Sequence, residues 1–189
     1  SVLKNGYLTQ GNKLRKFETE IENVFKTKHA IVCNSGTAAL HLVYDALGLG
    51  PKNGLLTSPV TFLATANAAK MCNAPVTFAD IDPKTGLLTP ESIEYVLENS
   101  KHKIKVITVV HLGGKVCDLK EISKVAKKYN CYLVEDACHA PGALTFKGNK
   151  KQEIHNSCKY SIASTYSFHA IKHIAMGEGG CVTTNNDPM

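Results

Sequence analysis

A lysine and an aspartate that each follow a strand-like run carry the clearest chemical signal in the chain. Lys172 lies in the segment S-F-H-A-I-K-H-I-A-M-G-E-G-G, and Asp136 lies upstream in L-V-E-D-A-C-H-A. A lysine amine can hold an aldehyde cofactor as a Schiff base, and an aspartate can keep a pyridine nitrogen protonated. These are the two protein groups that chemistry on pyridoxal phosphate needs most.

The sequence around both residues fits this interpretation. Lys172 lies among small and apolar residues, where partial burial favours the uncharged amine. Ser167, upstream of it, could offer its hydroxyl to a phosphate. Asp136 follows a strand too apolar to be exposed, so its carboxylate needs a partner. A pyridinium nitrogen would be such a partner, and a helix or turn cap is the alternative.

Four further features could serve the same site. The run S-G-T-A-A-L (35–40) joins a predicted strand to a predicted helix, where free N–H groups and the helix dipole suit a phosphate. A plain helix cap explains that run equally well. His111 and His139 could each donate to a ring oxygen or satisfy local backbone. Phe62 could stack on a planar ring or pack in the core.

The elements that position these residues alternate between helix and strand. Helical spacing predicts helices within 14–25, 40–47, 61–71, 90–97 and 119–129. Thr89 and Asp118 are predicted caps, and Asp118 with Glu121 resembles a capping box. Apolar runs predict strands near 29–33, 54–59, 76–80, 105–111, 131–136, 164–168 and 180–184. This alternation indicates an α/β fold with a parallel sheet whose carboxyl ends would carry the site.

Composition narrows the class further. The 189 residues suit one domain, and no apolar run approaches the roughly 20 residues that a membrane helix needs. The seven cysteines are odd in number and form no C-x-x-C, so we expect neither disulfides nor a metal site, and we expect a cytoplasmic protein. The net charge of +6 is spread along the chain with a single arginine, which favours a solvated face over nucleic-acid binding.

Jointly these motifs resemble the DegT/DnrJ/EryC1/StrS family of pyridoxal-phosphate sugar aminotransferases. The resemblance runs over nearly the whole chain. Its residues are L-T-Q-G (8–11), S-G-T-A-A-L, P-V-T-F-L-A-T-A-N (59–67), E-D-A-C-H-A (135–140) and S-F-H-A-I-K with the following G-E-G-G. It implies the type I fold of pyridoxal-phosphate-dependent transferases, which is like aspartate aminotransferase and has a large domain with a mostly parallel sheet flanked by helices.

The resemblance also implies roles for individual residues. Lys172 would be the Schiff-base and proton-transfer lysine, and Asp136 would pair with the pyridine nitrogen. His139 would lie near the phenolic oxygen of the ring, and Phe62 would stack on the ring. Three residues would hold the phosphate: Thr37, Ala38 and Ser167.

The family supplies further expectations about the reaction. Its members transaminate nucleotide-linked keto sugars, usually with glutamate as donor, in cell-surface polysaccharide or nonulosonic acid biosynthesis, and they act as homodimers. Residues 1–189 would form the pyridoxal-phosphate-binding large domain, and the family's smaller C-terminal domain is absent from this chain. One departure is P-K-N-G (51–54), where the family commonly has G-D-E.

Three alternatives remain open at this point. A sugar dehydratase of the same family would typically replace the lysine with histidine, so Lys172 argues against it. A dinucleotide-binding oxidoreductase would need G-x-G-x-x-G between the first strand and helix, where the chain has none. A truncated remnant of the fold could bind the cofactor without turning over.

Overall fold

The structure is a computed structural model that describes residues 2–4, 6–147, 150–154 and 157–187. Its α-helices are α1 (Asn12–Phe25), α2 (Gly36–Ala46), α3 (Ala64–Met71), α4 (Pro90–Asn99) and α5 (Leu119–Lys128), with short 3-10 helices η1 (Val2–Lys4) and η2 (Leu112–Gly114). Its strands are β1 (His29–Cys33), β2 (Gly54–Thr57), β3 (Val76–Phe78), β4 (Ile104–Val110), β5 (Tyr132–Asp136), β6 (Leu144–Lys147), β7 (Lys150–Ile154), β8 (Ala163–Ser167) and β9 (Gly180–Thr184). Among these described residues, no helix is long and apolar enough to cross a bilayer.

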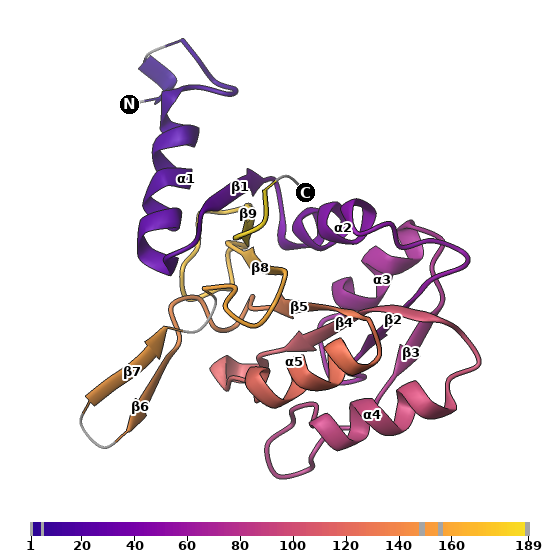
Figure 1. The fold of residues 1–189 in the computed structure, drawn as a ribbon. Helices are drawn as coiled ribbons and strands as arrows, with labels where there is room; N and C mark the ends of the chain where they lie inside the picture. The colour runs from indigo at the N-terminus through magenta and orange to yellow at the C-terminus, as the bar shows by residue number, and fades with distance from the viewer. Residues whose placement is uncertain (1, 5, 148–149, 155–156, 188–189) are drawn as a thin grey trace.

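Seven strands form one sheet in the order β1-β9-β8-β5-β4-β2-β3 (Figure 1). Neighbours are parallel except where β9 pairs antiparallel with both β1 and β8. Strand β9 therefore runs against the rest of the sheet, and the carboxyl ends of β1, β8, β5, β4 and β2 reach one edge. The predicted α/β fold with a mostly parallel sheet is confirmed.

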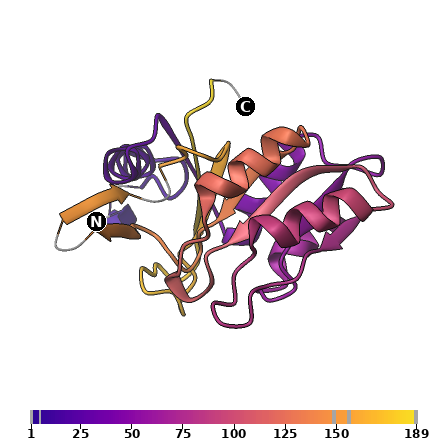
Figure 2. The same ribbon diagram turned by 60° about the horizontal axis from the view of Figure 1, so that its bottom comes forward.

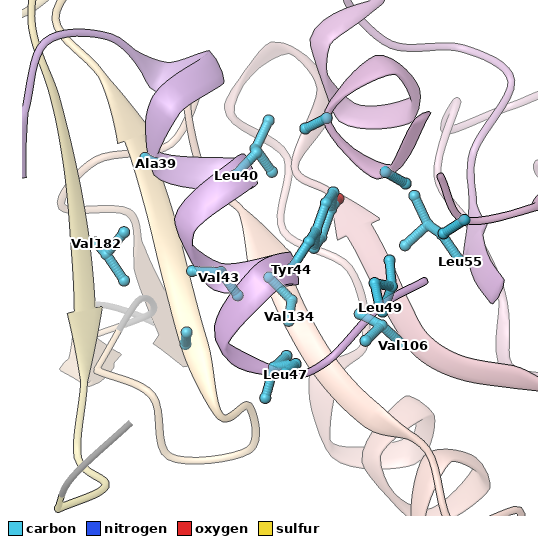
Figure 3. Packing of buried hydrophobic residues seen from close by; sticks show 14 of the residues in the cluster. Ala39, Leu40, Val43, Tyr44, Leu47, Leu49, Leu55, Val106, Val134 and Val182 are labelled. Atoms are coloured by element: carbon cyan, nitrogen blue, oxygen red, sulfur yellow. The ribbon is translucent and has the colours of Figure 1, made fainter. Parts of the chain in front are cut away.

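Helices cover both faces of this sheet (Figures 1 and 2). Successive strand residues point to opposite faces, so Leu55 and Val106 pack with α2 and α3 while Leu56 and Ile107 pack with α4 and α5. Figure 3 shows the first of these clusters gathered around Tyr44 of α2. A third cluster seats α1 on the end of the sheet formed by β1, β9 and β8. Burial on both faces explains why the strands are nearly continuous apolar runs.

Several details differ from the sequence-based expectation. Strand β2 ends at Thr57 because Pro59 has no N–H to donate to a ladder. Helix α3 begins at Ala64 rather than residue 61, since the Ser58 hydroxyl accepts the Val60 N–H at 3.0 Å in a turn. The β6–β7 hairpin, which projects from the body in Figure 1, was not predicted.

The predicted cap of α5 is present in part. Asp118 accepts the Glu121 N–H at 3.2 Å, but the Glu121 carboxylate binds Lys124 instead of reaching back. A reciprocal capping box is found at α4, where Thr89 and Ser92 each accept the backbone N–H of the other. Both helices therefore begin where the sequence places their caps.

Helix α1 seals the outer edge of strand β1. Glu18 accepts the Val32 N–H at 3.1 Å, and Glu22 accepts the Ala30 N–H at 3.3 Å. Arg15 contacts both carboxylates. These bonds satisfy edge groups that could otherwise pair with another chain, and they fix the strand that leads into α2.

Replacing Glu18 and Glu22 together with alanine should therefore lower the free energy of unfolding by about 1–3 kcal/mol and promote association through the exposed edge. Thermal denaturation with light scattering measures both effects. Glu20→Ala, an exposed position of the same helix, is the matched control. A double variant that behaves like this control would show that the edge does not depend on the two carboxylates.

Candidate active site

A cavity of about 370 Å³ lies where the ends of β4, β5 and β8 meet the start of α2. Its lining includes predicted site residues from four separate segments of the chain: Thr37, Phe62, Asp136, His139, Ser167 and Lys172. Of the residues to which the family resemblance assigns a role, Ala38 alone is not in the lining. The lysine and the aspartate that opened the sequence argument therefore face the same cavity.

A larger hollow, of about 450 Å³, lies between α2 and the strands β1 and β9. Its lining is mainly apolar, with an ion pair between His29 and Asp187 at one side. It contains no lysine and no buried carboxylate. The smaller cavity is thus the place where the chemically capable groups converge.

Asp136 ends strand β5 and is only 5% exposed. The Thr65 hydroxyl donates to its Oδ2 at 2.7 Å, and the Cys138 N–H donates to its Oδ1 at 3.3 Å. Within the described residues, no lysine, arginine or histidine lies at ion-pair distance from it. Its carboxylate is oriented by neutral donors and retains acceptor capacity on the cavity side.

Thr65 is a site residue that sequence reasoning missed. It is fully buried in the Ala-rich helix α3, with Thr61 Oγ1 3.0 Å from its own hydroxyl. The Tyr44 hydroxyl lies 3.2 Å from the Thr65 carbonyl and 3.0 Å from Thr108 Oγ1. In the sequence, Thr65 is a hydroxyl residue among alanines on one helix face, and this was the available signal. Its partner, Asp136, could not be identified from the sequence because the pairing depends on how α3 packs against β5.

The start of α2 is pressed against the ends of β8 and β9. Ser35 caps the helix and accepts the Ala38 N–H at 3.1 Å, so this N–H already has a partner. The N–H groups of Gly36 and Thr37 belong to the first turn and have no partner within the helix. A β-carbon on Gly36 would lie 2.8 Å from that of Ser167, so the approach requires glycine.

Gly180 has the same function on the neighbouring strand. A β-carbon there would lie 2.1 Å from the Ser35 carbonyl oxygen. Gly180 begins β9, as the predicted strand over 180–184 implies, and lies beneath the helix cap. These two contacts bring the Thr37 and Ser167 hydroxyls to one corner of the cavity.

Lys172 lies on a loop whose two ends are tied together. The Phe168 N–H donates to the Gly179 carbonyl at 2.8 Å, and the Met176 N–H donates back to Phe168 at 2.9 Å. His169 and Glu178 add an ion pair of 3.5 Å at the same neck. Lys172 itself is half-buried, whereas its apolar neighbours are exposed. The closed neck holds the lysine over the cavity without burying the loop.

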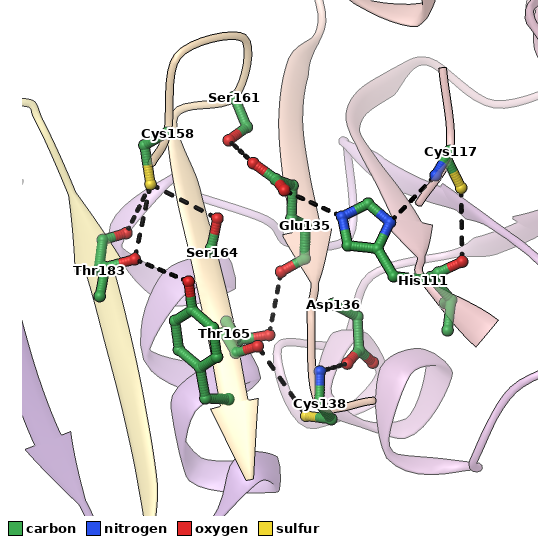
Figure 4. Close-up of polar contacts among 12 residues, drawn as sticks. His111, Cys117, Glu135, Asp136, Cys138, Cys158, Ser161, Ser164, Thr165 and Thr183 are labelled. Carbon is green, nitrogen blue, oxygen red and sulfur yellow. Dashed lines mark hydrogen bonds and ion pairs between the residues drawn. The ribbon is translucent and has the colours of Figure 1, made fainter. Parts of the chain in front are cut away.

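The two histidines considered beside the ring have different surroundings. His139 lines the cavity, and its Nδ1 accepts the Gly113 N–H at 3.4 Å. His111 does not line it. Its fully buried ring lies between Glu135 and the Cys117 N–H, so it is part of the scaffold (Figure 4). His169, for which the sequence suggested no role, also lines the cavity.

The chain is similar in sequence to known aminotransferases. Residues 1–189 match the sequence profile of the DegT/DnrJ/EryC1/StrS aminotransferase family. The chain is 42% identical over 185 residues to the UDP-4-amino-4,6-dideoxy-N-acetyl-beta-L-altrosamine transaminase of Campylobacter jejuni subsp. jejuni serotype O:23/36 (strain 81-176). That match covers 98% of this chain and 47% of the relative, and the chain spans about half the length of the curated relatives it matches.

Solved structures share the fold of the chain. The aminotransferase from Psychrobacter cryohalolentis superposes with a TM-score of 0.88 at 35% identity, covering 98% of this chain and 45% of that one. NtdA from Bacillus subtilis, solved with bound cofactor PMP, superposes with a TM-score of 0.87 at 31% identity, covering 98% and 40%. The fold class expected from the resemblance is thereby confirmed. By sequence and by fold, the chain belongs to the DegT/DnrJ/EryC1/StrS aminotransferase family.

Proposed function

We propose that residues 1–189 form the pyridoxal-phosphate-binding domain of an aminotransferase that acts on a nucleotide-linked keto sugar with glutamate as amino donor. The observation that carries this proposal is the single cavity lined by both Lys172 and Asp136. Relatives named for a UDP-linked sugar and for GDP-perosamine support the substrate class. Cell-surface polysaccharide or nonulosonic acid biosynthesis in the cytoplasm is the proposed setting, in keeping with seven free cysteines.

The residues present fit pyridoxal phosphate. Free N–H groups at the start of α2, with the Thr37 and Ser167 hydroxyls, make an anion-binding corner. Asp136 is a buried carboxylate without a cationic partner among the described residues, which suits a pyridinium nitrogen. Lys172 supplies the amine for the aldehyde. The volume of about 370 Å³ is in the range of small-molecule sites.

When bound, the cofactor supplies an electron sink that lets nitrogen pass between an amino acid and a keto group. Lys172 would hold it covalently, and the Lys172 amine would also be the group that moves a proton to and from the Cα of the donor. Asp136, oriented by Thr65 and the Cys138 N–H, stabilises positive charge on the ring nitrogen. Phe62 is 65% exposed beside the cavity, which leaves an aromatic face free to stack on the ring.

His139 acts as a neutral donor in this proposal. Burial lowers its pKa, and the Lys172 charge lowers it further, whereas Asp136 raises it. Because Nδ1 accepts the Gly113 N–H, the proton of the neutral ring is on Nε2. That N–H is available to donate to the phenolic oxygen of the cofactor.

A homodimer is also proposed. Large apolar side chains are exposed around the cavity, and the lysine loop contributes the most exposed of them, Ile171 at 82%. Contact with a second copy would cover these side chains.

Lys172 should become covalently labelled. Protein mixed with pyridoxal phosphate should develop a new absorbance band, and borohydride followed by peptide mass spectrometry should place the label on Lys172. The Lys172→Ala variant should show neither the absorbance band nor the label. The Lys70→Ala variant, which changes an exposed lysine beside a different hollow, should show both. A label retained in Lys172→Ala would reject the assignment. Glutamate should then discharge the band, and a band indifferent to glutamate would favour binding without turnover.

Thr65→Val should weaken cofactor binding. The change keeps the volume of the side chain but removes the hydroxyl that donates to Asp136 Oδ2. A lost hydrogen bond to a charged acceptor costs about 2 kcal/mol, or roughly a 30-fold rise in the Kd for pyridoxal phosphate. Absorbance titration measures this. Thr65→Ser, which keeps the donor, should stay near wild type, and equal affinities in all three proteins would show that Asp136 is held without Thr65.

In the cofactor-free protein, the pKa of His139 should depend on the charges of Lys172 and Asp136. NMR titration of the cofactor-free protein should show a pKa below the ordinary value of about 6.5. Lys172→Ala should raise it by removing a cation, and Asp136→Asn should lower it by removing an anion. Shifts of the same sign, or none, would mean that His139 does not lie between these two charges.

A further inference from the structure

A second cluster of polar groups, drawn in Figure 4, is centred on the face of β5 opposite the cavity and is not used by the proposed chemistry. Its centre is Glu135, the residue before Asp136 on β5. Successive strand residues point to opposite faces, so Glu135 points away from the cavity and is fully buried. His111 is fully buried beside it, with Nε2 2.9 Å from Glu135 Oε2. A buried carboxylate so deep in the sheet needs a structural reason.

Glu135 is well supplied with donors. Ser161 donates to its Oε1, and His111 occupies Oε2. Burial raises the pKa of Glu135, but the hydrogen bonds that it accepts from His111, Ser161 and Ser164 lower it by more, so the net direction is downwards. The carboxylate form is therefore the one that the protein is built around, and His111 is its largest partner.

His111 links this carboxylate to the cavity through its backbone. Its N–H donates to the Asp136 carbonyl at 3.2 Å, at the point where β5 ends. The Cys117 N–H donates to its Nδ1 at 3.3 Å, so both ring nitrogens are engaged. The ring can neither rotate nor shift without breaking a buried hydrogen bond.

The turn that follows His111 reaches the other side of the site. Residues Leu112–Gly114 form η2, in which Gly113 and Gly114 have φ angles of 61° and 85°. The Gly113 N–H donates to His139 Nδ1, and a β-carbon on Gly114 would lie 3.3 Å from the His139 carbonyl oxygen. The position of the His139 ring therefore depends on where His111 places this turn.

We infer that Glu135 and His111 form a positioning pair, which holds Asp136 and the His139 ring in place from the face of the sheet opposite the cavity. The inference rests on the proposed cofactor site, because it gives a reason for fixing these two groups. Neither residue of the pair touches the cavity. Their effect passes through one backbone hydrogen bond and one glycine turn.

The test uses Glu135→Gln and His111→Gln, which keep polar side chains of similar size but remove the charge or the ring. In the cofactor-free protein, NMR titration should show the pKa of His139 moving towards its ordinary value as the ring loses its fixed position. The Kd for pyridoxal phosphate should rise about tenfold, as for other outer-layer positioning groups. Both variants should shift alike, because the pair acts as a unit.

Ile93→Val is the matched control, since it trims a fully buried side chain of α4 remote from the site. It should lower thermal stability while leaving the His139 titration and cofactor affinity unchanged. If Glu135→Gln and His111→Gln behave like this control, the inference is wrong and the pair only stabilises the fold. Should either fail to fold, Ser161→Ala removes one donor from Glu135 and must shift His139 in the same direction by less; no shift there also overturns the inference.

These outcomes separate the inference from the proposed function. A wild-type protein that binds no pyridoxal phosphate would reject the function, while the His139 titration would still decide on the positioning pair. A wild-type protein that binds it, with variants equal to wild type in both readouts, would reject the pair alone.

Discussion

A carboxylate without a cation, buried at the end of a central strand, is the constraint on which the rest of the site depends. Asp136 is oriented by a threonine hydroxyl and a backbone N–H, which fix its direction but do not balance its charge. Such a group is costly unless a cation meets it. In the described part of the chain that cation is absent, and the exposed side of the carboxylate faces the cavity that also holds Lys172.

The parallel sheet brings the other polar groups of the candidate site to the edge where Asp136 lies. Parallel strands bring Asp136, Ser167 and the start of α2 to one edge, because their carboxyl ends coincide. Two glycines then allow the helix to approach the strands more closely than any side chain would permit: Gly36 against Ser167 and Gly180 against Ser35. The proposed phosphate site would thus depend mainly on this close backbone approach, and the Thr37 and Ser167 hydroxyls would complete it.

Much of this arrangement could be predicted from the sequence, for reasons that are visible in particular residues. Apolar runs and caps such as Thr89 gave the elements, and the order of strands and helices gave the sheet edge at which Asp136 and Lys172 meet. The reversed direction of β9 and the β6–β7 hairpin could not be predicted, because strand direction depends on pairing between distant segments. Neither could the bond from Thr65 to Asp136, which joins residues 71 positions apart.

The role of the His111 side chain could not be predicted from the sequence either. His111 was predicted to be the last residue of an apolar strand and directly follows β4 in the structure, but its side chain could have served the cavity or the scaffold. Only packing decides, and Glu135 and the Cys117 N–H take both of its ring nitrogens. The same limit applies to Ala38, whose N–H could bind either a phosphate or the residue that caps the helix. In the structure, the Ser35 hydroxyl accepts this N–H.

In the proposed cofactor site, the Asp136 carboxylate meets a protonated pyridine nitrogen. Nitrogen NMR of the protein loaded with pyridoxal phosphate labelled with nitrogen-15 in its ring tests this most directly. The wild-type protein should show the chemical shift of a protonated ring nitrogen, and Asp136→Asn should show that of an unprotonated one. The same shift in both proteins would contradict it.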